Sequence, residues 1–297
     1  MTRAECRAFA KINLALDVLG VREDGYHSVR MIMQEISLSD TVEIEKREEP
    51  GFCLLCDEPG IPTDGKNLAV RAASDMFRAY GLMGGLTIRL KKRIPAAAGL
   101  AGGSSDAAAV IRLVNVLYRL ELSEQKLRET GLKIGADVPY CIQGGTALSE
   151  GIGEILSPLS PCPDCGILLC KPEEGASTAE IYRAFDALEN PCHPPVDEGI
   201  RALIAGDFAA LSRAAGNSLE AVTKKKIPLI GEIEEEMLRS GASASCMSGS
   251  GPTVFGLFPD LRAAEAAEKA LKKAFPSCFT AAVRPVNARD ERRVTLF

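Results

Sequence analysis

The sequence predicts an α+β protein with two lobes. Its 297 residues correspond to two domains at roughly 150 residues each. Segments with the apolar alternation of strands are interspersed with segments of helical spacing along the chain. The run from Ser157 to Pro163 contains three prolines, which exclude a helix or a central strand and favour a linker. We therefore expect an N-terminal domain over residues 1–158 and a C-terminal domain over residues 159–297.

Composition and charge exclude several classes of function. The formal net charge of -5 gives no basic surface for nucleic acid, so we expect no nucleic-acid partner. No stretch approaches the ~18 consecutive apolar residues of a membrane span, and the first residues lack the apolar core of a signal peptide. We expect no membrane partner and a cytoplasmic location, where the ten cysteines would be reduced thiols.

Two C-x-x-C pairs, Cys53 with Cys56 and Cys162 with Cys165, have the spacing of tetrahedral zinc sites. The chain has only two histidines, and the pairs lie in sequence typical of a strand and a proline-rich loop. Cysteine is also a common small, buried apolar residue. We therefore expect no bound metal at these pairs.

The first strand is predicted over Ala8–Val18, where apolar and polar residues alternate. One face is expected to carry Ala8, Ala10, Ile12, Leu14, Leu16 and Val18 toward the core. Lys11 and Asn13 lie two residues apart on the opposite face, which places a cation and an amide side by side. A solvated strand lysine is the more usual interpretation of Lys11.

The turn that follows, Arg22 to His27, has Asp-Gly at its pivot and presents Tyr26 and His27 together. An aromatic ring beside an imidazole can stack on a flat heterocycle and form hydrogen bonds with it. A plain hairpin tip with a partly buried tyrosine explains the local sequence equally well. Two strands joined by a turn are expected over Ile32–Glu45, followed by a strand over Phe52–Cys56.

The most informative stretch is a loop of small residues, Pro95 to Asp106, with three glycines and two serines. It connects a predicted strand, Leu86–Lys91, to a helix whose apolar residues recur at helical spacing. Free backbone N–H groups and the helix dipole make such a turn suitable for binding phosphate. The loop is neither a P-loop nor a dinucleotide fingerprint, because no Lys follows its last glycine and G-x-G-x-x-G is absent. The alternative is a tight turn before a helix capped by Ser104 or Ser105.

The later half contains further strands and helices and one more candidate carboxylate. Asp137 lies two residues before Pro139, where capping a helix or fixing a turn is its more common use. A second loop of small residues, Ser243–Gly251, leads into a strand. Helices are expected over Asn67–Tyr80, from Ser123, from a capping box at Ser177–Glu180, and over Val196–Ala205, Phe208–Ala215, Ile227–Ser240 and Leu261–Ala274, with strands over Gly166–Cys170, Thr253–Phe258 and Thr280–Pro285.

With these segments in order, the chain resembles the GHMP kinase superfamily. Pro95–Ser105 is similar to its phosphate-binding signature, and Ser248–Gly251 resembles its C-terminal glycine-rich motif. Four segments are similar to the members that phosphorylate a cytidine diphosphate sugar alcohol: Ala10–Leu14, Gly25–His27, Gly99–Asp106 and Gly135–Pro139. The resemblance implies two α+β lobes, the first with a left-handed βαβ unit and the second ferredoxin-like, and a cleft between them in which ATP and substrate meet.

The resemblance also implies an activity, the ATP-dependent phosphorylation of the 2-hydroxyl of that alcohol in non-mevalonate isoprenoid biosynthesis. Asp137 would accept the hydroxyl proton, and Lys11 would hold Asp137 ionised while neutralising charge on the transferring group. His27 would read the cytosine edge, Tyr26 and Tyr182 would enclose its ring, and Asn13 would position the substrate.

The implied cofactors are ATP and Mg²⁺, with Ser104 and Ser105 reaching phosphate oxygens or the cation. The expected ATP-binding residues are Pro95, Ala96, Ala97, Ala98, Gly99, Leu100, Ala101, Gly102, Gly103, Ser104, Ser105, Asn67 and Lys92. A monomer or a homodimer is expected. Two alternatives remain: another GHMP kinase, such as a homoserine or phosphomevalonate kinase, which Tyr26-His27 argues against, and a non-catalytic sensor, which the presence of both Lys11 and Asp137 argues against.

Overall fold

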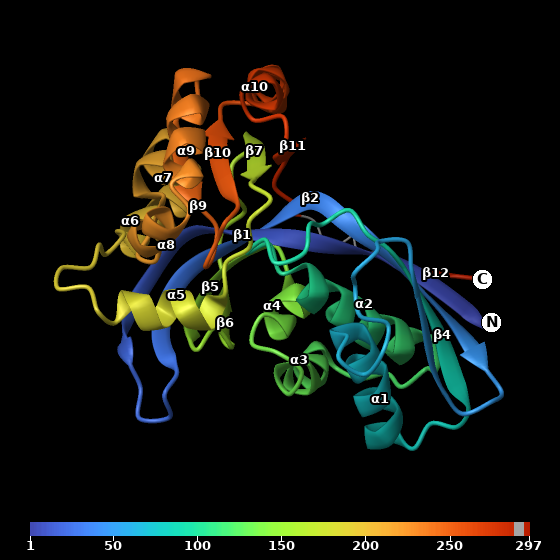
Figure 1. Cartoon of the computed structure of the whole chain (residues 1–297). Helices are drawn as coiled ribbons and strands as arrows, with labels where there is room; N and C mark the ends of the chain where they lie inside the picture. The colour runs from blue at the N-terminus through green and yellow to red at the C-terminus, as the bar shows by residue number, and fades with distance from the viewer. Residues whose placement is uncertain (288–293) are drawn as a thin grey trace.

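The first lobe is built on two long antiparallel strands, β1 (Arg3–Val21) and β2 (His27–Arg47), shown in Figure 1. This computed structural model describes residues 1–287 and 294–297. The remaining strands of the sheet are β3 (Gly51–Cys56), β4 (Gly85–Lys91), β5 (Thr146–Gly151), β6 (Ile155–Pro158), β8 (Gly216–Asn217) and β12 (Thr295–Leu296). Their main order is β12-β1-β2-β4-β3, with β5 and β6 continuing from β2 and β8 lying parallel to β1. Strands from both ends of the chain therefore meet in one sheet.

The prediction of two strands and a turn over residues 32–45 is wrong, because β2 is continuous there. The strand changes partner along its length: its first half pairs with β5, and Thr41–Arg47 pairs with β4. Its polar middle is satisfied by protein groups, since the Asp40 carboxylate accepts the backbone N–H of Ile94 at 2.8 Å and the Ser37 N–H bonds to Arg284 O at 2.9 Å. Polar residues at the point where a strand changes its pairing partner give the same sequence pattern as a turn.

The single apolar face predicted for Ala8–Val18 is also wrong. The pairing of β1 with β2 shifts register between Phe9 and Lys11 and again between Asn13 and Ala15. The first irregularity offsets the pairing by two residues and the second by one, and irregular pairing of this kind changes the direction of the side chains along a strand. Ala10, Ile12 and Leu14 therefore join a core between the lobes, whereas Ala8, Leu16 and Val18 pack under the helices of the first lobe.

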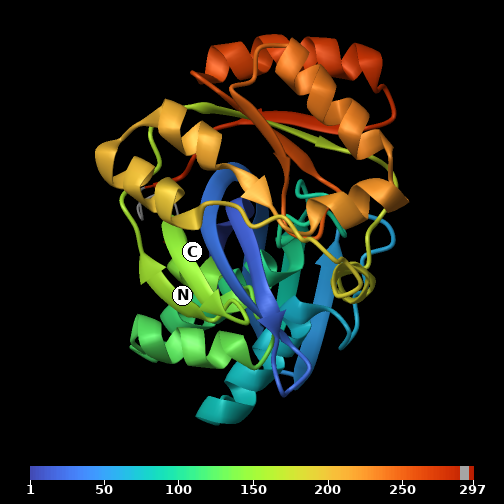
Figure 2. The ribbon, with the colours of Figure 1, turned by 90° about the vertical axis from the view of Figure 1, so that its left-hand side faces the viewer.

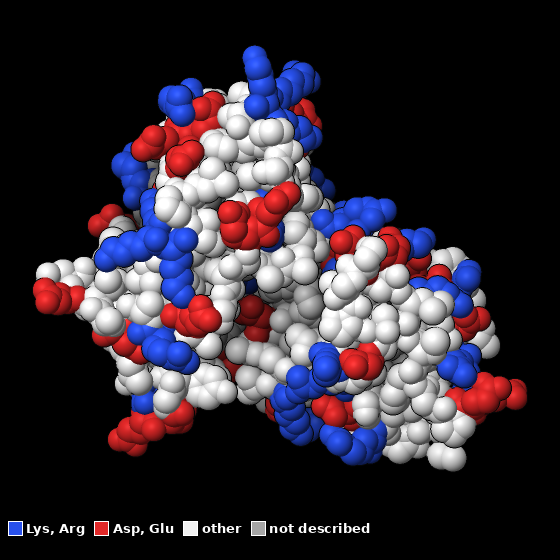
Figure 3. All heavy atoms as spheres, in the orientation of Figure 1, with Lys and Arg blue, Asp and Glu red and all other residues white. Residues whose placement is uncertain are grey.

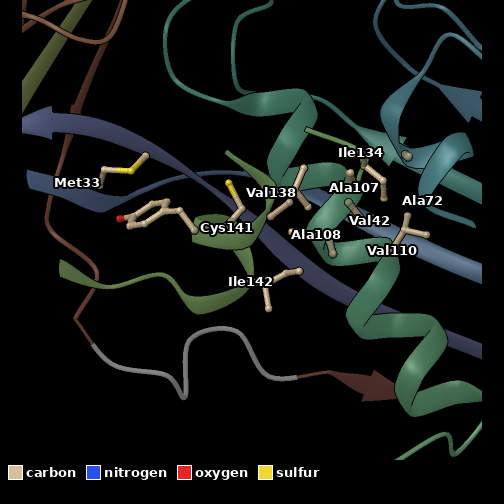
Figure 4. Close-up of a cluster of buried hydrophobic side chains, with 14 of the residues drawn as sticks. Met33, Val42, Ala72, Ala107, Ala108, Val110, Ile134, Val138, Cys141 and Ile142 are labelled. Atoms are coloured by element: carbon tan, nitrogen blue, oxygen red, sulfur yellow. The ribbon is translucent and has the colours of Figure 1, made fainter. Parts of the chain in front are cut away.

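Helices cover one face of this sheet. α1 (Leu68–Tyr80) connects β3 to the parallel neighbour β4, which gives the βαβ unit expected of the fold. α2 (Gly102–Leu117), α3 (Glu124–Leu132) and α4 (Val138–Gln143) complete the layer. Apolar side chains of α2 and α4, among them Ala107, Val110 and Val138, pack in the buried cluster of Figure 4.

The second lobe has a ferredoxin-like sheet. Its strands are β7 (Gly166–Lys171), β9 (Ala244–Met247), β10 (Val254–Phe258) and β11 (Phe279–Val283), in the order β11-β7-β10-β9 with every neighbouring pair antiparallel. α9 (Leu229–Arg239) and α10 (Leu261–Ala274) pack on this sheet at the top of Figure 2. The order of strands and helices is that of a split βαβ fold, which confirms the expectation for this lobe.

Four further helices lie between β7 and α9: α5 (Thr178–Phe185), α6 (Val196–Ala205), α7 (Phe208–Ala214) and α8 (Glu220–Lys226). α8 was not predicted, because its seven residues end in three lysines and are too few to show a helical period. α9 begins two residues later than predicted, because Pro228 occupies its N-cap position. None of the described helices combines the length and the apolar character of a membrane span.

Candidate active site

A cavity of ≈ 1050 Å³ opens between the lobes, where the surface in Figure 3 is hollowed. Most of the residues expected to bind ligands line it: Lys11, Asn13, Tyr26, His27, Asn67, Lys92, Pro95, Ala96, Ala97, Ala98, Gly99, Ala101, Gly102, Gly103, Ser104, Asp137 and Tyr182. Two expected residues do not. Leu100 is buried in the core between the lobes, and the Ser105 hydroxyl donates a hydrogen bond to the Phe9 carbonyl oxygen. Neither side chain is directed to the cavity.

The N-terminus of α2 faces the cavity without a side-chain cap. Its N-cap residue is Ala101, in the left-handed region with φ 58°, and no side chain accepts a hydrogen bond there. The alternative of a serine cap is therefore wrong. By contrast, α1, α3, α7 and α10 are capped by Asn67, Ser123, Asp207 and Asp260. The first N–H groups of a helix have no intrahelical acceptor, so those of Gly102, Gly103 and Ser104 are available to an anion at the positive end of the helix dipole.

The two glycine-rich loops touch each other at Gly99. A Cβ atom on this residue, whose φ is +72°, would lie 2.3 Å from the carbonyl oxygen of Ser248. The Gly99 carbonyl oxygen accepts hydrogen bonds from the Ser248 hydroxyl at 3.1 Å and from Lys11 Nζ at 3.0 Å. Only glycine permits this approach, which joins the first lobe to the second at the cavity wall.

Lys11 is buried, with 4% of its surface exposed, and its ammonium lies at this junction. Nζ donates to Asn13 Oδ1 at 2.8 Å as well as to Gly99. An ammonium has three donors, so one remains for a ligand. The structure does not place Lys11 in a hydrogen bond or ion pair with Asp137 among the described residues, although both line the cavity.

Asp137 immediately precedes α4, but its carboxylate accepts no capping hydrogen bond from that helix. Asp137 therefore does not act as a helix cap, which is the common role of an aspartate at this position before a proline. Its charge acts on neighbours: burial, and after it the Asp137 charge, raises the pKa of Tyr182 to about 12 and that of Cys141 to about 12. Asp137 is thus an acceptor in the cavity wall, close to Tyr182.

Lys92 lies at the start of the small-residue loop. Its ammonium lies between two carboxylates, those of Asp40 and Asp106, the latter at 2.5 Å. Burial lowers the pKa of Lys92, but the two carboxylates outweigh it and raise that pKa. Burial raises the pKa of Asp106 to about 7, with Asp40 adding to the rise and Lys92 opposing it. One oxygen of Asp106, Oδ1, is buried without a hydrogen-bond partner and belongs to a residue that lines the cavity.

At the other end of the cavity, the β1–β2 turn meets α5. His27 Nε2 lies 2.7 Å from Asp186 Oδ1, and the His27 ring lies 4.7 Å from that of Tyr182, tilted by 43°. Tyr26 also lines the cavity but leaves 60% of its surface exposed. The rings of His27 and Tyr182 are thus in contact in the cavity wall.

Sequence reasoning missed several lining residues, among them Lys66, Asp106, Thr178, Arg183 and Asp186. Asp106 was visible as the acid ending the small-residue loop. Arg183 and Asp186 follow Tyr182 on α5, and only the packing of that helix against the hairpin brings them to the site. The described residues contain no group of three or more His, Cys, Asp or Glu able to hold a metal ion, and all ten cysteines are free thiols.

Comparison with known proteins shows the family of the chain. The GHMP kinases N terminal domain family matches residues 67–145, and the GHMP kinases C terminal family matches residues 200–277. The chain is 46% identical to the 4-diphosphocytidyl-2-C-methyl-D-erythritol kinase of Clostridium beijerinckii, over 92% of this chain and 97% of that one. The chain belongs to the 4-diphosphocytidyl-2-C-methyl-D-erythritol kinases of the GHMP family.

Other relatives support the assignment to this kinase family. The enzyme of the same name from Acetivibrio thermocellus is 47% identical over 94% of this chain and 98% of its own. A crystal structure of a 4-(cytidine 5'-diphospho)-2C-methyl-D-erythritol kinase has a TM-score of 0.79 at 35% identity and covers 94% of this kinase and 99% of that chain. A homoserine kinase from Cytophaga hutchinsonii also reaches 0.79, but at 18% identity over 99% and 98% of the two chains it shows the shared fold alone.

Proposed function

We propose that this kinase transfers the γ-phosphoryl group of ATP to the 2-hydroxyl of 4-diphosphocytidyl-2-C-methyl-D-erythritol. The observation that carries the proposal is one cavity that combines the uncapped N-terminus of α2, the ammonium of Lys11 and the carboxylate of Asp137, which does not cap α4. We also propose that the two domains divide at residue 158 and that the protein is a monomer or a homodimer.

The ATP phosphates would bind at the N-terminus of α2, on the backbone N–H groups of Gly102, Gly103 and Ser104. The adenosine would extend along the wall made by residues 61–68, where Asn67 caps α1. Lys92 supports the loop from below, because its ammonium is occupied by Asp40 and Asp106. It acts on ATP by fixing the loop.

The cavity also fits the Mg²⁺ that accompanies ATP. Mg²⁺ prefers one or two carboxylates together with phosphate oxygens and water. Asp106 offers a buried carboxylate oxygen without a hydrogen-bond partner beside the small-residue loop. We propose Asp106 as the side chain that would hold the cation together with phosphate oxygens and water; when bound, the cation would neutralise charge on the phosphates.

Transfer of a phosphoryl group has a loose transition state that depends on positioning and charge stabilisation more than on proton abstraction. Lys11, held by Asn13 and Gly99, would place its remaining donor on an oxygen of the transferring group. Asp137 would accept the proton of the attacking hydroxyl and orient it. The base end of the substrate would lie between Tyr26, His27 and Tyr182, which line the far wall.

The proposal is tested by measuring ADP release with Mg²⁺, using the cytidine compound, homoserine, mevalonate and phosphomevalonate as acceptors. We expect turnover with the cytidine compound alone. Turnover with another alcohol and none with the cytidine compound would retain the kinase fold and overturn the assignment of the base end. No turnover with any acceptor would favour a sensor.

A further inference from the structure

The chain has two histidines, and each is paired with an aspartate at the same distance. His27 Nε2 lies 2.7 Å from Asp186 Oδ1 in the cavity wall, and His193 Nδ1 lies 2.7 Å from Asp17 Oδ1. Only the first pair is part of the cavity. The His27 side chain is 11% exposed, against 54% for His193. Both pairs join an imidazole to a carboxylate, although Asp17 also accepts a hydrogen bond from the Ser218 hydroxyl at 3.0 Å. The pair outside the cavity serves as a control for the pair inside it.

The Asp186 carboxylate determines which nitrogen of His27 carries the proton. An ionised carboxylate only accepts hydrogen bonds, so the nitrogen facing it must be the donor. The neutral imidazole then has its proton on Nε2 and an acceptor lone pair on Nδ1. Among the described residues, Nδ1 of His27 has no hydrogen-bond partner, although its side chain is nearly buried. A ligand donor would satisfy it.

Tyr182 and Asp186 belong to one turn of α5 and hold the imidazole from two sides. The Tyr182 ring lies 4.7 Å from it, and Asp186, the C-cap residue of the helix, fixes its edge. A ring held in both plane and tautomer presents its acceptor in a fixed direction. Cytosine carries an exocyclic amino group at the position where uracil carries a carbonyl oxygen. An acceptor nitrogen attracts the first and repels the second.

We infer that Asp186 is a positioning residue that makes His27 select a cytosine base over uracil. The inference rests on the proposed function, because it assigns the base end of the same cavity. Asp186 lies at the end of a helix with its side chain 39% exposed and has no part in the chemistry of transfer. It acts through the proton on His27 Nε2.

The test compares Asp186→Ala with the matched variant Asp17→Ala, each assayed with the cytidine substrate and its uridine counterpart. Loss of the acceptor at Asp186 is expected to raise KM for the cytidine substrate about tenfold, the cost of about one hydrogen bond. KM for ATP stays the same, and the ratio of kcat/KM for cytidine over uridine falls by a similar factor. Asp17→Ala leaves both values at those of the wild type.

A second measurement uses the wild-type protein and does not require a folded variant. Long-range ¹H–¹⁵N NMR spectra of the ¹⁵N-labelled wild-type protein report the tautomer of each histidine, and the inference requires the Nε2–H form for neutral His27. A Nδ1–H form, or an unchanged cytidine-to-uridine ratio in a folded Asp186→Ala, overturns it. Failure of the proposed function would look different, because the wild-type protein would then not turn over the cytidine compound.

Discussion

A single substitution at Gly99 is expected to disrupt the contact between the two glycine-rich loops. In Gly99→Ala, the new Cβ would lie 2.3 Å from the Ser248 carbonyl oxygen and 3.2 Å from that of Gly251. A φ of +72° adds a backbone penalty for any residue with a Cβ. The left-handed conformation costs roughly 1–2 kcal/mol, and the forced separation of packed groups costs about 1–3 kcal/mol more.

The free energy of unfolding should therefore fall by about 2–5 kcal/mol, which lowers Tm by roughly 3–8 °C, because a chain of this size unfolds with an entropy of about 0.6 kcal/mol/K. KM for ATP should rise at least about tenfold, because Gly99 O also holds Lys11 and Ser248. Scanning calorimetry and steady-state kinetics measure both. The matched control is Ala101→Gly, also in the left-handed region with φ 58°, which should remain within about 1 kcal/mol of the wild type. A Gly99→Ala protein with unchanged Tm and unchanged KM for ATP would refute the argument.

Two further predictions concern charge. Lys11→Met should lower kcat by about 10²–10³ with a smaller effect on KM, because its free donor is assigned to the transferring group, and an unchanged kcat in a folded variant would contradict this. Glu234 has its pKa raised to about 8 by burial and by Glu220, against the opposing effect of Lys224. The folded protein binds the proton of Glu234 more tightly than the unfolded chain does, so the free energy of unfolding declines as pH rises from about 4.5 to 8. Measured as Tm against pH, this decline should be smaller in Glu234→Gln. An equal decline in the two proteins would argue against the reasoning.

The sequence was sufficient where a local pattern determines local structure. Asn67 and Gly81 mark the ends of α1 because their side-chain and backbone preferences act within one turn. The small-residue loop leads into α2 as predicted, and the binding of phosphate there stays a prediction. α6 and α10 lie where their apolar periodicity placed them.

The sequence was insufficient where contacts between distant segments determine the structure. The register shifts in β1 that send Ile12 to a second core depend on its pairing with β2, and nothing within Ala8–Val18 shows them. Ser105 resembled a ligand-binding residue until the fold brought the Phe9 carbonyl to it. Asp186 is an ordinary helix-end aspartate until α5 packs against the β1–β2 turn. These are tertiary contacts between residues far apart in the chain.

The most direct test of the central claim is the ³¹P NMR spectrum of the reaction of ATP, Mg²⁺ and 4-diphosphocytidyl-2-C-methyl-D-erythritol, with the wild-type protein and with Asp137→Asn. The account predicts a new phosphomonoester signal without three-bond proton coupling in the wild-type reaction, because C2 carries a methyl group and no hydrogen, and a rate at least about 10²-fold lower with Asp137→Asn. Release of inorganic phosphate without the ester, or equal rates for the two proteins, would contradict it.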